Sequence, residues 1–506
     1  MTSVAIAPVT DPGAHRRATP APGRSWSDWC LVVGLLLLPL SVAVVAWRPE
    51  LLPWVLAAPL AAATGVVAVL VVTRHPGAGV GGAVVVFALS GELQLRLGPL
   101  VGPLKDGVLV VLVAAAGATL LRRRSVSPGL RRLVVPATLL TVLALLYLAD
   151  PAGGHGVSWL FGTRLLLSGL LLGAAGVLLA DRGTVRALVG VLAVVMPLEA
   201  ALAWWQRSLG WEQLVYGWGY QFGAQVRLGT GGGLRTSGTF QDPFQLAALA
   251  VVTLTVGIFL ATGPLRVLLC LAAVTAMVAT DVRTAVLQSG LVLVVWAISR
   301  GLWRQAAVVA AVGLAAATLV LGTTTSSVVP GGVERPLLLT LNGRLIAWSN
   351  AVSSVDSVLV GNGVGDRGTG STRTSARAED APRYDEETEP VPLYAGNEAF
   401  LDSAYAQVLS DVGIVGVLAL TGAGVSTATI LVRRARAPER GRAAGLGAVR
   451  APDPAAACAW TAVALLLAAA VDWVGRASLA SFSTGYLTLL VLGALTGAAL
   501  RSEASR

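Results

Sequence analysis

Charged residues are scarce in this chain: they make up 13% of its 506 residues, whereas 55% are hydrophobic. A soluble domain carries about a quarter charged residues, because they cover its surface. The scarcity therefore excludes an ordinary soluble domain. The apolar residues form long runs between short polar stretches, and runs of about 18 or more are long enough to cross a bilayer. Because the runs are continuous rather than alternating, they predict membrane-spanning helices instead of a β-barrel.

The sequence also lacks the motifs of several enzyme classes. It has no zinc-binding pattern, P-loop or dinucleotide fingerprint, and no D-x-D motif of the kind with which nucleotide-sugar enzymes hold a divalent cation. Its three cysteines, Cys30, Cys270 and Cys458, fall at or inside apolar runs without the spacing of metal ligands, so we expect them to be packing residues. We therefore expect neither a metal ion nor a cofactor.

The net charge of +10 is placed where it orients the chain in a membrane, which argues against a nucleic-acid partner. With the N-terminus taken as cytoplasmic, we predict an all-α, polytopic membrane protein of about 12–14 transmembrane helices. Every loop that this topology places inside contains arginine, and the short outer connection 150–157 contains none. Both termini are therefore expected in the cytoplasm, with the chain in the cytoplasmic (inner or plasma) membrane. The first apolar run is interpreted as a retained anchor rather than a signal peptide. The predicted spans are 29–47, 51–73, 80–97, 105–121, 133–149, 158–180, 185–205, 242–261, 264–280, 284–299, 304–322, 405–432, 456–474 and 482–500.

The spans and loops divide the chain into seven regions. They are a basic cytoplasmic tail (1–28), N-terminal transmembrane helices (29–205), an outer loop rich in aromatic residues and arginine (206–241), central helices (242–322), a large outer loop (323–400), C-terminal helices (401–500) and a second cytoplasmic tail (501–506). Both outer loops are too long to be simple connectors, and long loops are often functional.

The two outer loops have different compositions. In the first, the aromatic residues fit either an interfacial belt or a sugar-stacking surface with cations for an anionic headgroup, and both interpretations stay open. In the second, apolar residues at helical spacing predict a helix over 342–360. The glycine-rich run 361–365 then ends that helix, and it is more typical of a turn than of a phosphate-binding loop.

Ionisable residues at membrane depth are costly, so they are candidates for function. Two pairs four residues apart, Glu92 with Arg96 and Asp472 with Arg476, are predicted to form structural ion pairs. Four arginines at the predicted outer face have no obvious local carboxylate partner, apart from Asp281 near one of them. They are Arg164, Arg235, Arg283 and Arg344. If they converge on one cavity they would suit a diphosphate, because guanidinium binds phosphate in a fixed fork.

Five short segments between about 160 and 500 carry a further pattern. Residues 235–244 read RTSGTFQDPF, residues 280–287 read TDVRTAVL, residues 344–348 read RLIAW, residues 360–365 read VGNGVG and residues 402–416 read DSAYAQVLSDVGIVG. They resemble, in order, the R-x-x-G-T-F-x-N/D-P-N, S-R-x-A, R-x-x-x-W, P-L-x-G-x-G-x-G and H/D-N-x-Y-L-x-x-L-x-E-x-G-I-x-G stretches of the O-antigen ligase and polymerase superfamily. The ligases carry His where this chain has Asp402, and Ser403 replaces the usual Asn. This departure favours a polymerase-like or other polysaccharide-transferring member over a strict lipid A ligase.

The resemblance implies a GT-C-like helix bundle and a membrane glycosyltransferase of cell-surface polysaccharide biosynthesis. Such a protein would use an undecaprenyl-diphosphate-linked oligosaccharide donor and a glycan or lipid acceptor at the outer face, by a metal-independent, inverting displacement. The four arginines above would bind the diphosphate. Asp402, with Glu398 as a second candidate, would act as the base or orient the acceptor. The expected partners are membrane lipid, a flippase and a chain-length regulator.

Two other functions remain open on the sequence alone. A multi-pass transporter or flippase, of a small solute or a lipid-linked sugar, would use Glu199, Asp472 and Arg164 as its path. The sequence has no clear internal repeat of the kind that many transporters show, and its long outer loops are not needed by a pore. A non-catalytic scaffold is the third alternative.

Overall fold

The computed structural model describes residues 52–97, 101–122, 127–153, 156–222, 225–228, 233–308, 310, 349, 352–353, 355–366, 403–437 and 453–501. Within these ranges the secondary structure is almost entirely helical, which confirms an all-α polytopic membrane protein. Eight of the described helices are long and apolar enough to span a membrane, or nine if one bent pair forms a single span. The predicted span 29–47 and most of 304–322 lie outside the described residues.

The described elements follow the predicted spans closely. The N-terminal helices are α2 (Leu52–Arg74), α3 (Pro76–Ala88), α4 (Ser90–Leu97), α5 (Val101–Arg122), α6 (Pro128–Arg131), α7 (Val134–Ala149), α8 (Val157–Leu179) and α9 (Arg182–Leu209). The first outer loop contains a π-helical turn, η3 (Gln213–Gly217), and an antiparallel ribbon of β1 (Arg227–Leu228) and β2 (Leu234–Arg235). The later helices are α10 (Pro243–Leu260), α11 (Gly263–Thr280), α12 (Arg283–Ser299), α16 (Ala404–Arg436), α17 (Pro454–Gly475) and α18 (Thr484–Arg501).

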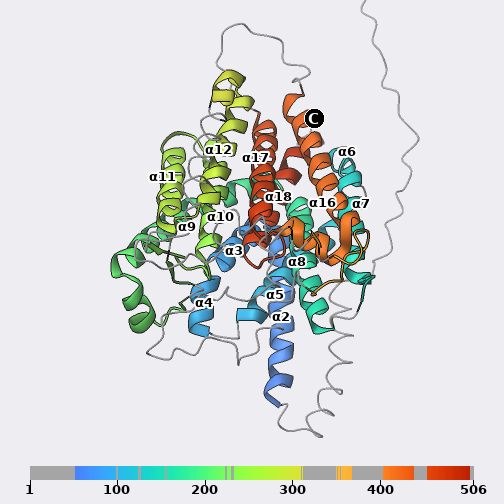
Figure 1. Ribbon diagram of the computed structural model, residues 1–506, viewed down its shortest axis with the longest axis horizontal. Coiled ribbons are helices and arrows are strands. Elements are labelled where there is room, and N and C mark those ends of the chain that lie inside the picture. Colours follow the sequence, from blue (N-terminus) through green and yellow to red (C-terminus); the bar gives the residue numbers. More distant parts are fainter. Residues whose placement is uncertain are drawn as a thin grey trace, which may run out of the picture. The chain divides into compact units, whose positions relative to one another are not determined.

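The chain divides into two compact units, Met1–Val66 and Val67–Arg506, and the core lies in the second. Helices α18 and α10 are at its centre, since 83% and 72% of their apolar windows are buried, against 17% for α5. Figure 1 shows α17 and α18, in red, next to one another in this unit. Helix α18 approaches α8 very closely: a Cβ atom at Gly493 would lie 2.1 Å from the Gly173 carbonyl oxygen. Such contacts between small residues are typical of helices that pack within membranes.

Helix ends that the predicted topology puts on the same side of the membrane meet in the structure. At one end, Arg501 at the end of α18 donates to the carbonyl of Val177 in α8, at 2.9 Å. At the other end, the backbone N–H of Ala404, at the start of α16, donates to the carbonyl of Arg476 after α17, at 3.2 Å. The relative directions of α8 and α18, and of α16 and α17, are therefore those of the predicted topology.

Two segments differ from the predicted regular helices. The predicted span 80–97 is bent by 57° between α3 and α4, where the Glu92 N–H donates to the carbonyl of Thr239 in the first outer loop, at 2.8 Å. The prediction of a helix through to residue 360 is wrong at its end: residues 355–360 form turns and bends. The N–H of Ile414 in α16 donates to the carbonyl of Val358, at 2.8 Å, so tertiary contacts replace the helical ones.

Candidate functional site

The first outer loop is fastened to α9 by two buried polar side chains. Glu199 accepts from the N–H of Thr239 at 2.9 Å, and also from its hydroxyl group. The side-chain amide of Gln206 forms two hydrogen bonds with the backbone of Gly238. Its NH2 group donates to the Gly238 carbonyl at 2.8 Å, and its oxygen accepts from the Gly238 N–H at 2.9 Å. Because α9 is a packed helix, this clamp gives the segment after β2 a fixed position.

The clamp also explains a glycine in the RTSGTF segment. Gly238 has φ +60°, and a Cβ atom there would lie 2.2 Å from Oε2 of Glu199. A residue with a side chain would be both strained and in collision with the carboxylate. The sequence shows the glycine but not the buried carboxylate against which it packs.

The clamped segment carries Arg235 to the joint between α11 and α12. The Nε atom of Arg235 lies 3.7 Å from Oδ2 of Asp281, and the hydroxyl group of Thr236 donates to the carbonyl of Ala279 at 3.1 Å. Asp281 adopts the left-handed conformation, with φ +49°, in the tight turn that precedes Arg283. Two of the four predicted arginines, Arg235 and Arg283, thus lie beside the same turn.

Charges on neighbouring elements act on Arg235. Burial lowers the pKa of its guanidinium group, Asp281 raises it, and the like charges of Arg283 and Arg227 lower it further. Arg227 lies opposite Arg235 in the ribbon of β1 and β2. Burial is the largest of these effects on the pKa of Arg235, and the carboxylate of Asp242 opposes it together with that of Asp281.

Two further guanidinium groups flank the ring of Phe244, in the first turn of α10. Those of Arg476 and Arg227 lie 4.5 Å and 5.5 Å from its ring centre, within the range of cation–π contacts. Arg227 also pairs with Asp242 at 2.9 Å, and Asp242 caps α10 by accepting from the Phe244 N–H at 2.7 Å. We call Arg227, Arg235, Arg283 and Arg476 the arginine site.

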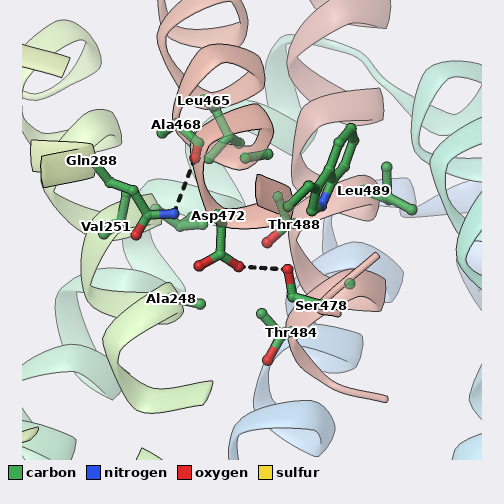
Figure 2. Close-up of a pocket in the computed structure, with 14 residues that line it drawn as sticks. Ala248, Val251, Gln288, Leu465, Ala468, Asp472, Ser478, Thr484, Thr488 and Leu489 are labelled. Carbon is green, nitrogen blue, oxygen red and sulfur yellow. Dashed lines mark hydrogen bonds between the residues drawn. The ribbon is translucent and has the colours of Figure 1, made fainter. Parts of the chain in front are cut away.

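Arg476 connects this site to the centre of the bundle. It pairs with Asp472 at 3.3 Å, which confirms that predicted ion pair. The other predicted pair, Glu92 with Arg96, is also confirmed, at 2.9 Å. Asp472 also accepts from the hydroxyl group of Ser478 in a cavity of about 20 Å³, as Figure 2 shows. Such a volume has room for about one water molecule, so the cavity is no channel.

Arg164 has a different environment from the other predicted arginines. It forms an ion pair with Asp106 of α5, a partner 58 residues away along the chain. Both side chains are about half exposed. Arg164 and Arg235 thus have no local carboxylate partner, as expected, but each lies beside a carboxylate from a distant part of the chain: Asp106 for Arg164 and Asp281 for Arg235.

The glycine-rich run 361–365 packs against a break in α16. The N–H of Asn362 donates to the carbonyl of Ser410 at 2.7 Å. At the break, Gly413 has φ +71°, and a Cβ atom there would lie 2.3 Å from the carbonyl oxygen of Leu359. The run is thus a turn in close contact with a helix, which agrees with its interpretation as a turn.

Three of the predicted site residues, Arg344, Glu398 and Asp402, lie outside the described residues. Among the described ones, no group of three or more His, Cys, Asp or Glu side chains could hold a metal ion. The sequence predicted Arg476 only as part of a structural pair and Arg227 only as one of the outer-loop cations that could hold an anionic headgroup, and it predicted no separate role for Phe244. The sequence does mark Phe244, which is the last residue of the RTSGTFQDPF segment. It does not show that the guanidinium groups of Arg227 and Arg476, which lie outside this segment, contact the Phe244 ring.

Residues 268–421 match the family model described as O-antigen ligase. This part of the chain is similar to an O-antigen ligase domain. The matched range includes Arg283, Arg344 and Asp402. The other members of the arginine site lie outside this range in the sequence: Arg227 and Arg235 precede it, and Arg476 follows it. No curated protein matches the chain significantly. This family indicates a membrane enzyme of polysaccharide biosynthesis that transfers glycosyl groups, with lipid-linked oligosaccharide and acceptor substrates.

Proposed function

We propose that this O-antigen ligase-like protein polymerises or ligates undecaprenyl-diphosphate-linked oligosaccharide units at the outer face of the cytoplasmic membrane. The observation that carries the proposal is the approach of Arg235, in a motif before the ligase domain, to the turn of Asp281 and Arg283 within it. Guanidinium groups held in fixed positions suit a diphosphate, because each offers paired N–H donors in a plane.

The arginine site would act when the donor bond breaks. The acceptor oxygen forms a bond to C1 of the donor sugar as the bond from C1 to the diphosphate oxygen breaks, and the diphosphate takes up negative charge. Arginines that are already positioned stabilise this charge without reorganising, which is the most effective form of electrostatic catalysis. Burial of Arg235 and the like charges of Arg283 and Arg227 near it favour an anion at this place. A metal ion is not required for this step.

The acceptor hydroxyl group loses a proton in the same step. We propose Asp402 as the group that accepts or orients this proton, with Glu398 as the second candidate. Attack opposite to the leaving group inverts the configuration at C1. The described residue next to Asp402 is Ser403, which caps α16 and donates to the carbonyl of Trp473 at 3.2 Å. The ligases have Asn at the position of Ser403 and His at the position of Asp402. These two differences favour a polymerase over a lipid A ligase.

A transport path is less well supported. Of its three proposed residues, Glu199 holds the outer loop, Asp472 accepts from Ser478, and Arg164 pairs with Asp106. Glu199 and Asp472 are 3% and 4% exposed. Carboxylates fixed in this way serve packing, whereas a solute path needs groups that face a water-filled cavity.

Chain growth in cells tests the proposal. Arg283→Ala and Arg344→Ala should stop growth of the surface glycan, so that lipid-linked repeat units accumulate while the protein still inserts in the membrane. The matched control is Arg300→Ala, because Arg300 is exposed at the opposite end of α12 from Arg283. Unchanged glycan length on a gel for both test variants would contradict the proposal.

A further inference from the structure

A second polar cavity, of about 240 Å³, lies beside the arginine site. Its walls come from α4, the loop between η3 and β1, and the start of α10. Five glutamines line it, and we call it the glutamine cavity: Gln94, Gln221, Gln225, Gln241 and Gln245. Its charged lining residues, Arg227 and Asp242, form an ion pair with each other at 2.9 Å. The cavity is therefore polar, yet its charges are balanced.

The glutamine side chains are held in place by the backbone and by one another. Gln225 accepts from the N–H of Gln221, and Gln245 accepts from the N–H of Gln241, both at 3.2 Å. The amide of Gln241 donates to that of Gln94, which joins the start of α10 to α4. A primary amide offers two donors and two acceptor positions, so these bonds use only part of the hydrogen-bonding capacity of the cavity.

The chemistry of the lining selects a class of ligand. An amide both donates and accepts hydrogen bonds, and so does a sugar hydroxyl group, whereas a phosphate or carboxylate only accepts. An anion would favour unpaired cations, and the Arg227 cation in the wall already faces Asp242. Leu95 supplies an apolar patch, as the C–H face of a sugar ring requires, and it packs on the cluster of Leu214 and Tyr220. Ligand pockets of drug size have volumes of about 300–1,000 Å³, so this smaller cavity suits a single ring.

We propose that the glutamine cavity binds one neutral sugar residue of the donor glycan, close to its diphosphate. The inference rests on the proposed function, and Arg227 supplies the link: it lines the cavity and also lies over the Phe244 ring in the arginine site. A sugar held here would align C1 of the donor, with the diphosphate held by guanidinium groups on one side. The cavity would thus contribute to the choice of the repeat unit that the enzyme accepts.

Binding of free sugars tests the site without requiring turnover. Saturation-transfer NMR on the full-length protein in lipid nanodiscs would use glucose, galactose and N-acetylglucosamine as neutral probes, glucuronic acid as the charged probe, and the surface polysaccharide of the producing strain. The test variant is Gln94→Ala with Gln221→Ala, because both side chains are exposed and their loss should leave the fold intact. The control is Gln213→Ala, an exposed glutamine of the same loop outside the cavity lining.

At least one neutral probe should bind, and its affinity should fall about tenfold in the double variant, as expected for two lost hydrogen bonds to neutral groups. The Gln213→Ala variant should bind as the native protein does. No signal from any neutral probe or from the polysaccharide, an equal signal in the double variant, or a glutamine-dependent preference for glucuronic acid would each overturn the proposal.

Arg283→Ala separates this inference from the proposed function. That variant should lose glycan transfer but keep the sugar signal, whereas the glutamine double variant should raise the KM for the donor about tenfold and keep most of kcat. No transfer by the native protein, together with a glutamine-dependent sugar signal, would remove the transferase proposal and leave a carbohydrate site. Lost transfer in Arg283→Ala without any sugar signal would do the reverse.

Discussion

Glu199, in the middle of the membrane helix α9, holds Thr239 of the outer loop through both its backbone N–H and its hydroxyl group. The same helix binds Gly238 through Gln206. A buried carboxylate of the kind that ion transporters use therefore has a structural role here, since it positions the segment that carries Arg235. Changes at Glu199 should act on the arginine site through the loop, not through a solute path.

Glu199→Gln should destabilise the loop while preserving the size of the side chain. The amide group replaces one acceptor oxygen with a donor nitrogen that cannot accept from Thr239, so we expect a loss of about 1–3 kcal/mol. A lower midpoint in thermal unfolding in detergent, together with reduced glycan transfer, would agree with this. Glu212→Gln is the matched control, since Glu212 is exposed in the same loop. Normal transfer with a loss of solute flux would contradict the structural role.

Gly238→Ala should destabilise the protein strongly, although it adds only one methyl group. The new Cβ atom would lie 2.2 Å from Oε2 of Glu199, in a backbone conformation that alanine rarely adopts. Gly190→Ala is the comparison: Gly190 lies inside α9, and a Cβ atom there has nothing within 4 Å. Helix propensity predicts that Gly190→Ala is neutral or stabilising, by up to about 1 kcal/mol. Equal unfolding midpoints for the two variants would show that the clamp is not tight.

The membrane helices could be predicted from the sequence because their signal is local. A run of apolar residues, bounded by Asp181 before α9 or by Asp242 and Pro243 at α10, determines a helix wherever the rest of the chain lies. Pairs such as Asp472 with Arg476 are also local, because four residues make about one helical turn.

The site could be predicted only in part, because its contacts join distant segments. Arg164 forms an ion pair with Asp106, which is 58 residues away in the sequence. The ring of Phe244 contacts the guanidinium group of Arg476, at the end of α17. The role of Asp411 was likewise hidden in the DSAYAQVLSD segment: it accepts from the hydroxyl group of Tyr147 in α7 at 2.7 Å. Apolar runs identify each helix, but they do not specify which polar residues of two helices meet.

Labelling from outside the cell tests the predicted sidedness. In a chain whose three cysteines are replaced, Tyr216→Cys in the first outer loop should react with a membrane-impermeant maleimide on intact cells, because Tyr216 is 71% exposed. Arg433→Cys, exposed near the end of α16, should react only after the cells are permeabilised. The opposite pattern would place the arginine site on the cytoplasmic side.

Asp402→Asn should separate the proposed base from the diphosphate site. The amide cannot take a proton from the acceptor, so we expect kcat to fall by about 100-fold or more, with little change in the KM for the donor. Glu398→Gln should have a smaller effect. Kinetics with purified protein and lipid-linked repeat units would measure both. Full activity of Asp402→Asn would make Asp402 a structural residue and move the role of base elsewhere.

The most direct measurement is transfer by the purified protein in nanodiscs, supplied with radiolabelled undecaprenyl-diphosphate-linked oligosaccharide and a chelator of divalent cations. The native protein should lengthen the glycan and release the lipid diphosphate despite the chelator. Arg283→Ala should lower kcat by about 100- to 1,000-fold, as for the loss of one preorganised group in other enzymes, while Arg300→Ala behaves as the native protein does. Transfer by Arg283→Ala at the native rate, or no transfer by the native protein, would contradict the account of the arginine site as the place where the donor bond breaks.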